Sequence, residues 1–202
     1  MTLLLERTRV KECGHVPYLD SLTAMRAFTA KRNDATPDEI WLVEHPPVYT
    51  LGQGAAEIHV ANGIPVLRSD RGGDITYHGP GQAVLYALLD LARRGIKVRE
   101  FVRLLEQCVI ELLGARAARR PGAPGVYVDG AKVAALGIRV VKGRSYHGLA
   151  LNVDMDLAPF AAIDPCGYPG LRVTQMKDLG FDESSAVLGR RLAEILVAKL
   201  DA

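Results

Sequence analysis

VYVDGAKVAALGIRVVKGRSYHGLALNV, residues 126–153, is the stretch that decides the fold. Asp129-Gly130 separates two apolar runs, and this dipeptide favours a tight hairpin turn because both central residues readily adopt positive φ. Residues 138–141 and 146–153 flank Lys142-Gly143-Arg144, which predicts a second hairpin. The stretch therefore predicts a β-meander.

Helices and further strands are predicted on both sides of this meander. Apolar side chains recur every three or four residues in three windows, which indicates amphipathic helices at 17–33, 99–113 and 185–200. Short apolar runs predict strands at 40–43, 48–51, 64–67 and 83–89. A β-rich middle, one internal helix and one terminal helix predict an α+β fold with a mixed, mostly antiparallel sheet flanked by helices. We expect a single domain over residues 1–202.

Composition and charge exclude several classes of protein. The chain has 202 residues, with 25 Lys and Arg against 23 Asp and Glu, a balance untypical of a dedicated nucleic-acid binder. Its apolar runs are too short for a membrane span, and its first ten residues lack the pattern of a secretory signal. We therefore expect a cytoplasmic protein without nucleic-acid or membrane partners. Its three cysteines should be free thiols, because an odd number does not suit a disulfide framework.

The segment RGGDITYHGPGQ, residues 71–82, fits neither a helix nor a strand pattern. Its glycines allow backbone to approach a ligand closely, and Arg71, Thr76, Tyr77 and His78 add hydrogen-bonding groups. It lacks the lysine and the Ser/Thr ending of a phosphate-binding Walker loop. The segment is either a ligand-lining loop or a long turn between strands.

The three cysteines differ in context. Cys108 lies on the apolar face of a predicted helix, as a buried thiol would, and Cys13 has few neighbours that would favour a thiolate. Cys166 lies in DPCGYPG, residues 164–170, a turn that presents its side chain and makes it the candidate nucleophile. Lys132, His78 and His147 are candidates to help it ionise. Lys132 interrupts an apolar strand, where a lysine is costly unless it is used, although an edge or solvent-facing lysine remains the alternative.

Four motifs in order resemble those of the lipoyl(octanoyl) transferase family, whose members are octanoyl-[acyl-carrier-protein]:protein N-octanoyltransferases. R-G-G-x-x-T-Y/W-H-x-x-G-Q-x-x-x-Y is matched by Arg71, Gly72, Gly73, Thr76, Tyr77, His78, Gly81, Gln82 and Tyr86. G-x-K-V/I-A-x-x-G-x-R is matched by Gly130, Lys132, Val133, Ala134, Gly137 and Arg139. H-G-x-A-L-N is matched by His147, Gly148, Ala150, Leu151 and Asn152, and P-C-G by Pro165, Cys166 and Gly167. The resemblance runs nearly end to end.

This resemblance implies a fold like that of the biotin and lipoate ligase catalytic domains and a ping-pong acyl transfer. Octanoyl, or lipoyl, would pass from acyl carrier protein to Cys166 and then to a lysine of lipoyl domains in 2-oxoacid dehydrogenase and glycine cleavage proteins. Lys132 would favour the Cys166 thiolate and move protons, and no cofactor or metal would be needed. The acyl site would be lined by Arg71, Gly72, Gly73, Asp74, Ile75, Thr76, Tyr77, His78, Ala135, Leu136, Gly137, Gly148, Leu149 and Ala150.

Two other functions stay open. An ATP-dependent lipoate or biotin ligase would share the fold but needs no nucleophilic cysteine, so Cys166 argues against it. A catalytically silent module could instead dock on acidic carrier proteins through its basic residues, Arg116, Arg119, Arg120, Lys142 and Arg144. That function leaves the contexts of Cys166 and Lys132 unexplained.

Overall fold

The computed structural model describes residues 8–58, 60, 62–163 and 171–202. Its helices are α1 (Tyr18–Lys31), α2 (Leu91–Arg94), α3 (Val98–Leu113) and α4 (Ser185–Leu200), with the 3₁₀ helices η1 (Ala158–Ala162) and η3 (Lys177–Leu179). Its strands are β1 (Thr8–His15), β2 (Asp38–Glu44), β3 (Val48–Leu51), β4 (Val66–Arg68), β5 (Ile75–His78), β6 (Gln82–Leu88), β7 (Ala117–Arg120), β8 (Ala123–Val128), β9 (Ala131–Val141) and β10 (Arg144–Asn152).

Ten strands form two sheets in this part of the chain. The larger has seven strands in the order β1-β2-β6-β10-β9-β8-β7; β1 and β2 pair in parallel, and the other neighbours are antiparallel. A three-stranded sheet has the order β4-β3-β5, with β3 parallel to β4 and antiparallel to β5. The predicted α+β class and mixed sheet are confirmed, and the second sheet is an addition.

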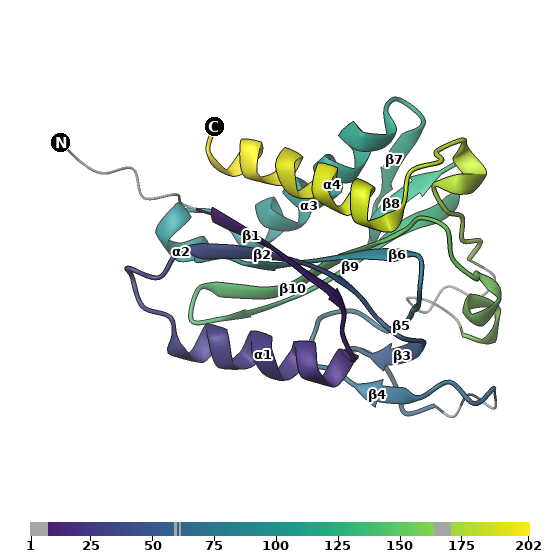
Figure 1. Cartoon of the computed structure of the whole chain (residues 1–202), viewed down its shortest axis with the longest axis horizontal. Coiled ribbons are helices and arrows are strands. Elements are labelled where there is room, and N and C mark those ends of the chain that lie inside the picture. Colours follow the sequence, from purple (N-terminus) through teal and green to yellow (C-terminus); the bar gives the residue numbers. More distant parts are fainter. Residues whose placement is uncertain (1–7, 59, 61, 164–170) are drawn as a thin grey trace.

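The large sheet is covered by helices on both faces (Figure 1). Leu85 and Leu151 pack with Phe101 of α3 and Leu192 of α4 in the core on one side. Alternate residues of the same strands turn the other way, because successive side chains of a strand point to opposite faces, and Tyr86 packs with α1. The central strands β6 and β10 are therefore buried nearly throughout.

The meander and its turns form as predicted. β8 and β9 are joined by Asp129 and Gly130 with φ of 50° and 78°, and β9 and β10 by Lys142 and Gly143 with the same values. Positive φ at both turn positions gives a backbone twist that matches the twist of the flanking strands. The long β9–β10 ladder that results pairs Ala135 with Ala150.

Three strands depart from the sequence-based expectations. β5 lies inside the segment 71–82, which was expected to be neither helix nor strand, because its pairing with β3 overrides the local glycine content. β1 and β7 were not predicted, since both are edge strands with mostly exposed, polar sequences that show no apolar alternation. Over the described residues, no helix is long and apolar enough to cross a membrane.

Candidate active site

A cavity lies between the β9–β10 ladder and the segment that contains β5. The predicted catalytic residue Lys132 lines it, together with most of the residues predicted to bind substrate: Arg71, Gly73, Asp74, Ile75, Thr76, His78, Ala135, Leu136, Gly137, Gly148, Leu149 and Ala150. Tyr18, Val84, Tyr86, His147, Asn152, Phe160 and Val173 complete the lining. Segments that are far apart in the sequence thus enclose one space, with Lys132 inside it.

Two predicted site residues, Gly72 and Tyr77, lie outside this lining. The Gly72 amide donates to the carbonyl of Ile138 at 2.9 Å and so ties the glycine-rich segment to β9. Tyr77 is buried in a cluster with Tyr49 and Phe160, and its ring centroid lies 5.5 Å from that of Phe160. These two residues support the wall of the cavity from behind.

Two glycines in the cavity wall permit close backbone approach rather than adding space for a ligand. A Cβ on Gly137 would lie 2.9 Å from the carbonyl oxygen of Gly72. A Cβ on Gly148 would lie 2.1 Å from the carbonyl oxygen of Leu85 on the adjacent strand. The small side chains that line the cavity here are those of Ala135 and Ala150, which are cross-strand partners in β9 and β10.

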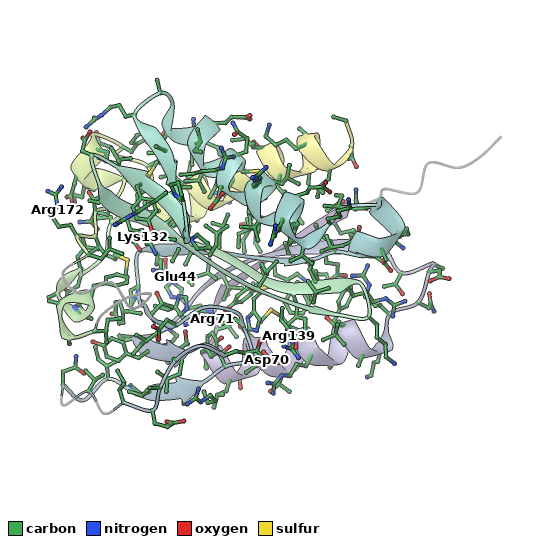
Figure 2. All side chains as sticks on the ribbon, turned by 180° about the vertical axis from the view of Figure 1, so that it is seen from behind. Glu44, Asp70, Arg71, Lys132, Arg139 and Arg172 are labelled. Atoms are coloured by element: carbon green, nitrogen blue, oxygen red, sulfur yellow. The ribbon has the colours of Figure 1, made fainter. Side chains whose placement is uncertain are left out.

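Lys132 is buried, with 4% of its surface exposed, so it is not the solvent-facing lysine that the sequence left as the alternative. Its Nζ lies 5.4 Å from the centroid of the Tyr127 ring, within the range of a cation–π contact. Its amide donates to the carbonyl of Arg172 at 2.8 Å, and its carbonyl accepts from the amide of Thr174 at 2.9 Å. Figure 2 shows Lys132 beside Arg172, and Arg71 lines the same cavity as Lys132.

Cys166, the predicted nucleophile, lies outside the described residues. Of the two described thiols, Cys108 is buried on α3, and burial raises its pKa to about 12. Cys13 lies on the exposed strand β1, and desolvation also raises the pKa of its thiol. Neither thiol has surroundings that favour a thiolate, as the sequence predicts.

His78 is enclosed on all sides. Burial, followed by the nearby His45, lowers its pKa to about 3, so its ring is neutral near pH 7. Its Nδ1 lies 2.7 Å from Oε1 of Gln82, and its Nε2 lies 3.5 Å from Oγ1 of Thr50. Both ring nitrogens therefore face protein groups.

His147 forms a pair that sequence reasoning missed. Its Nε2 lies 2.8 Å from Oδ1 of Asp70, and the Tyr146 hydroxyl donates to Oδ2 of the same carboxylate at 2.7 Å. Hydrogen bonds from His147, Tyr146 and Arg26 outweigh burial and lower the pKa of Asp70, whereas desolvation lowers the pKa of His147. His147 lies opposite Ile138, six residues along β9 from Lys132, which corresponds to about 20 Å.

Comparisons with known proteins identify the relatives of this chain. A family model described as the lipoyl protein ligase A/B catalytic domain matches residues 17–194. An octanoyltransferase of Aromatoleum aromaticum is 60% identical over 192 residues, which cover 93% of this chain and 83% of the relative. An octanoyltransferase of Dechloromonas aromatica is 57% identical over 197 residues, which cover 95% of this chain and 96% of the relative.

The chain belongs to the octanoyltransferase family. It is therefore an acyltransferase, and the resemblance seen in its motifs is confirmed.

Solved structures place the octanoyltransferase fold among the ligases. A lipoate-protein ligase A bound with ATP aligns with a TM-score of 0.77 at 17% identity, covering 96% of this chain and 86% of that one. A biotin protein ligase from Aquifex aeolicus aligns with a TM-score of 0.54 at 10% identity, and the alignment covers 98% of this chain and 70% of the ligase. At such identities the likeness concerns the fold alone, and it confirms the predicted architecture.

Proposed function

We propose that this octanoyltransferase takes octanoyl from acyl carrier protein onto Cys166 and passes it to a lysine of a lipoyl domain. The acceptors would be lipoyl domains of 2-oxoacid dehydrogenase and glycine cleavage proteins, and the reaction would be cytoplasmic. The buried Lys132 at the cavity is the observation that carries this proposal. A lysine is rarely buried in a strand unless its charge or its proton is used.

The first half-reaction exchanges one thioester for another. Lys132 takes the proton of the Cys166 thiol, and the thiolate forms a bond to the carbonyl carbon of the donor thioester. The bond from that carbon to the phosphopantetheine sulfur breaks, and the leaving thiolate takes the proton from the Lys132 ammonium. Because one thioester replaces another, this step is nearly isoenergetic.

The second half-reaction forms an amide. The amine of the acceptor lysine attacks the Cys166 thioester, the new C–N bond forms and the bond to Sγ breaks. Lys132 accepts the surplus proton of the amine and returns it to the Cys166 thiolate, which restores the starting state. The amide is much more stable than the thioester, so the sequence of steps proceeds without ATP.

We assign acyl binding to the cavity between β9, β10 and the segment from Arg71 to His78. Its walls are apolar where Ala135, Leu149 and Ala150 line it, and burying a methylene there contributes about 0.8 kcal/mol. An octanoyl chain with its carbonyl near Lys132 would run along the β9–β10 ladder. Gly72 and Tyr77, which support the wall, contribute indirectly.

A silent docking module is less well supported. Several of the basic residues that it would need are already engaged in ion pairs: Arg116 with Asp129, Arg119 with Glu106, and Arg144 with Asp90, at 2.9, 3.0 and 3.3 Å. The Glu106 and Asp90 carboxylates are buried, so Arg119 and Arg144 are already held by groups of the protein itself. A docking function also gives no reason for the burial of Lys132.

The decisive experiment is to trap the intermediate. Incubation with octanoyl-acyl carrier protein should add one octanoyl group to the protein, removable by hydroxylamine and absent from Cys166→Ala. Cys13→Ser, at an exposed position on β1, is the matched control and should acylate like the wild type. Acylation of Cys13 or Cys108, or turnover that survives in Cys166→Ala, would refute the proposal.

A further inference from the structure

A chain of side-chain hydrogen bonds links Arg71 to the segment beside Lys132. It passes through Thr50, His78, Gln82 and Asn152 and ends on the carbonyl of Thr174. The four intermediate side chains belong to residues that are at most 6% exposed and lie on four strands, β3, β5, β6 and β10. Three of them, His78, Gln82 and Asn152, are motif residues to which the proposed chemistry gives no direct part.

Each bond in the chain has a fixed direction. The Gln82 Nε2 donates to the carbonyl of Tyr77 at 3.3 Å, which orients the amide so that Oε1 faces His78. His78 must then donate from Nδ1, so its Nε2 is an acceptor for the Thr50 hydroxyl. The Thr50 oxygen in turn accepts from the Arg71 guanidinium at 2.9 Å.

The same orientation continues toward Lys132. The Gln82 Nε2 also donates to Oδ1 of Asn152 at 2.9 Å, across the β6–β10 pair in which these two residues are partners. The Asn152 amide is thereby oriented with Nδ2 toward Thr174, and it donates to that carbonyl at 3.0 Å. Asn152 also accepts from the amide of Met176 through its main-chain oxygen at 3.0 Å.

Thr174 belongs to the segment that brackets Lys132. The main-chain bonds of Lys132 to Arg172 and Thr174 form a parallel bridge opposite Val173. Val173, Asn152 and Lys132 all line the same cavity. Residues 172–174 therefore bond to the Lys132 main chain and are themselves held by the Asn152 side chain.

We propose that Asn152, oriented by Gln82 and His78, is a positioning residue that fixes residues 172–174 against Lys132 and so sets the place of the lysine in the cavity. This rests on the proposed function, because it assumes that Lys132 transfers protons. Asn152 need not touch the substrate. Its effect should appear in the rate of the chemical steps, because small displacements of a group that transfers protons slow them strongly.

Asn152→Asp tests this role with little change in shape. A carboxylate still accepts from Gln82, but its second oxygen faces the Thr174 carbonyl without a hydrogen to donate. At pH 7.5 we expect kcat to fall at least tenfold, with KM for octanoyl-acyl carrier protein within threefold of the wild type. On lowering the pH, protonation of the new carboxyl restores a donor, so the ratio of variant to wild-type kcat should rise.

Gln175→Glu is the matched control, since it makes the same amide-to-acid change in the same segment. The Gln175 side chain accepts from the Met155 amide and donates to Asp178, and within the described residues its hydrogen bonds do not reach the chain of Arg71 to Thr174, so its kcat ratio should stay near one and flat with pH. Gln82→Met is the second variant, used if Asn152→Asp does not melt cooperatively, and it should also lower kcat more than it raises KM.

The outcomes separate this inference from the proposed function. If the wild type transfers octanoyl but Asn152→Asp keeps kcat within twofold, or its kcat ratio does not change with pH, the positioning role is refuted. If kcat and KM change in equal proportion in the variant that folds, Asn152 acts on general structure and the inference also fails. If the wild type shows no Cys166-dependent transfer, it is the proposed function that fails.

Discussion

Lys132 and Val173 lie opposite each other in a parallel bridge, formed by the bond from the Lys132 amide to the Arg172 carbonyl and by that from the Thr174 amide to the Lys132 carbonyl. On its other side Lys132 pairs with Tyr127 of β8. The backbone of Lys132 is therefore held from both sides, although Lys132 is only the second residue of β9 and so lies near the end of the strand. Two neighbouring strands restrict its main chain, which favours a side chain held in one place for proton transfer.

Replacing Lys132 by arginine should separate its charge from its proton transfer. Arginine retains a positive charge but does not give up a proton in proteins, so transfer to the acceptor amine should fall about 10²–10⁴-fold. The rate of iodoacetamide alkylation at Cys166 should change much less, because a cation still favours the thiolate. Kinetics of acyl transfer and of alkylation on the same samples would measure both effects.

His78→Asn is the comparison for this prediction. The His78 ring is neutral and bonded through both nitrogens, so its loss should weaken positioning and leave the pH dependence of Cys166 alkylation unchanged. If His78→Asn alone shifts the alkylation profile to higher pH while Lys132→Ala does not, the base is His78 and the assignment to Lys132 is wrong.

Filling the cavity wall at Ala135 should shorten the acyl chain that the enzyme prefers. Ala135→Leu occupies space opposite Ala150, and displacing two methylenes at about 0.8 kcal/mol each should lower kcat/KM for octanoyl about tenfold or more. Butanoyl-acyl carrier protein should be affected much less. Ala118→Leu, at an exposed position on β7, controls for added bulk, and an equal loss for all chain lengths would contradict this acyl site.

The elements that the sequence predicts well have strong local signals. The apolar stripe of α3 ends at Gly114, whose φ is 77°, and each meander turn contains a glycine with positive φ, Gly130 or Gly143. β5 could not be predicted from its local sequence, since its strand geometry depends on pairing with β3, which lies 24 to 30 residues earlier.

The candidate site also contains residues that the sequence singles out and contacts that it does not predict. Lys132 stands out in the sequence as a lysine in an apolar strand, and its burial is found in the structure. The pairing of His147 with Asp70 joins positions 77 residues apart, and a single sequence carries no signal for it. The chain of bonds from His78 to Asn152 likewise depends on β5, β6 and β10 meeting in space.

Acid should destabilise the fold below about pH 6.5 because three histidines are buried in neutral form. Burial lowers the pKa values of His45, His78 and His147 below the value of about 6.5 that each has in the unfolded chain. The unfolded state therefore binds more protons, and each histidine removes up to about 1.4 kcal/mol of the free energy of unfolding per pH unit below that value. Asp70 acts in the same direction only below about pH 4, since its folded pKa is lowered.

Urea unfolding at pH 7.5, 6.5 and 5.5 measures this dependence. His45→Gln should reduce the slope of unfolding free energy against pH, because it removes one of the three buried histidines. Equal free energies of unfolding at pH 7.5 and 5.5 would contradict the prediction.

Transfer should need neither nucleotide nor metal, which distinguishes this enzyme from ligases of the same fold. The donor already carries a thioester, so the acyl group needs no activation as an adenylate. Within residues 8–58, 60, 62–163 and 171–202, no three His, Cys, Asp or Glu side chains gather closely enough to hold a metal ion. Octanoylation of a lipoyl domain, followed by mass spectrometry, should proceed at the same rate with EDTA and without ATP when octanoyl-acyl carrier protein is the donor. Productive transfer from free octanoate and ATP alone, with no reaction from the carrier-protein thioester, would make the protein a ligase.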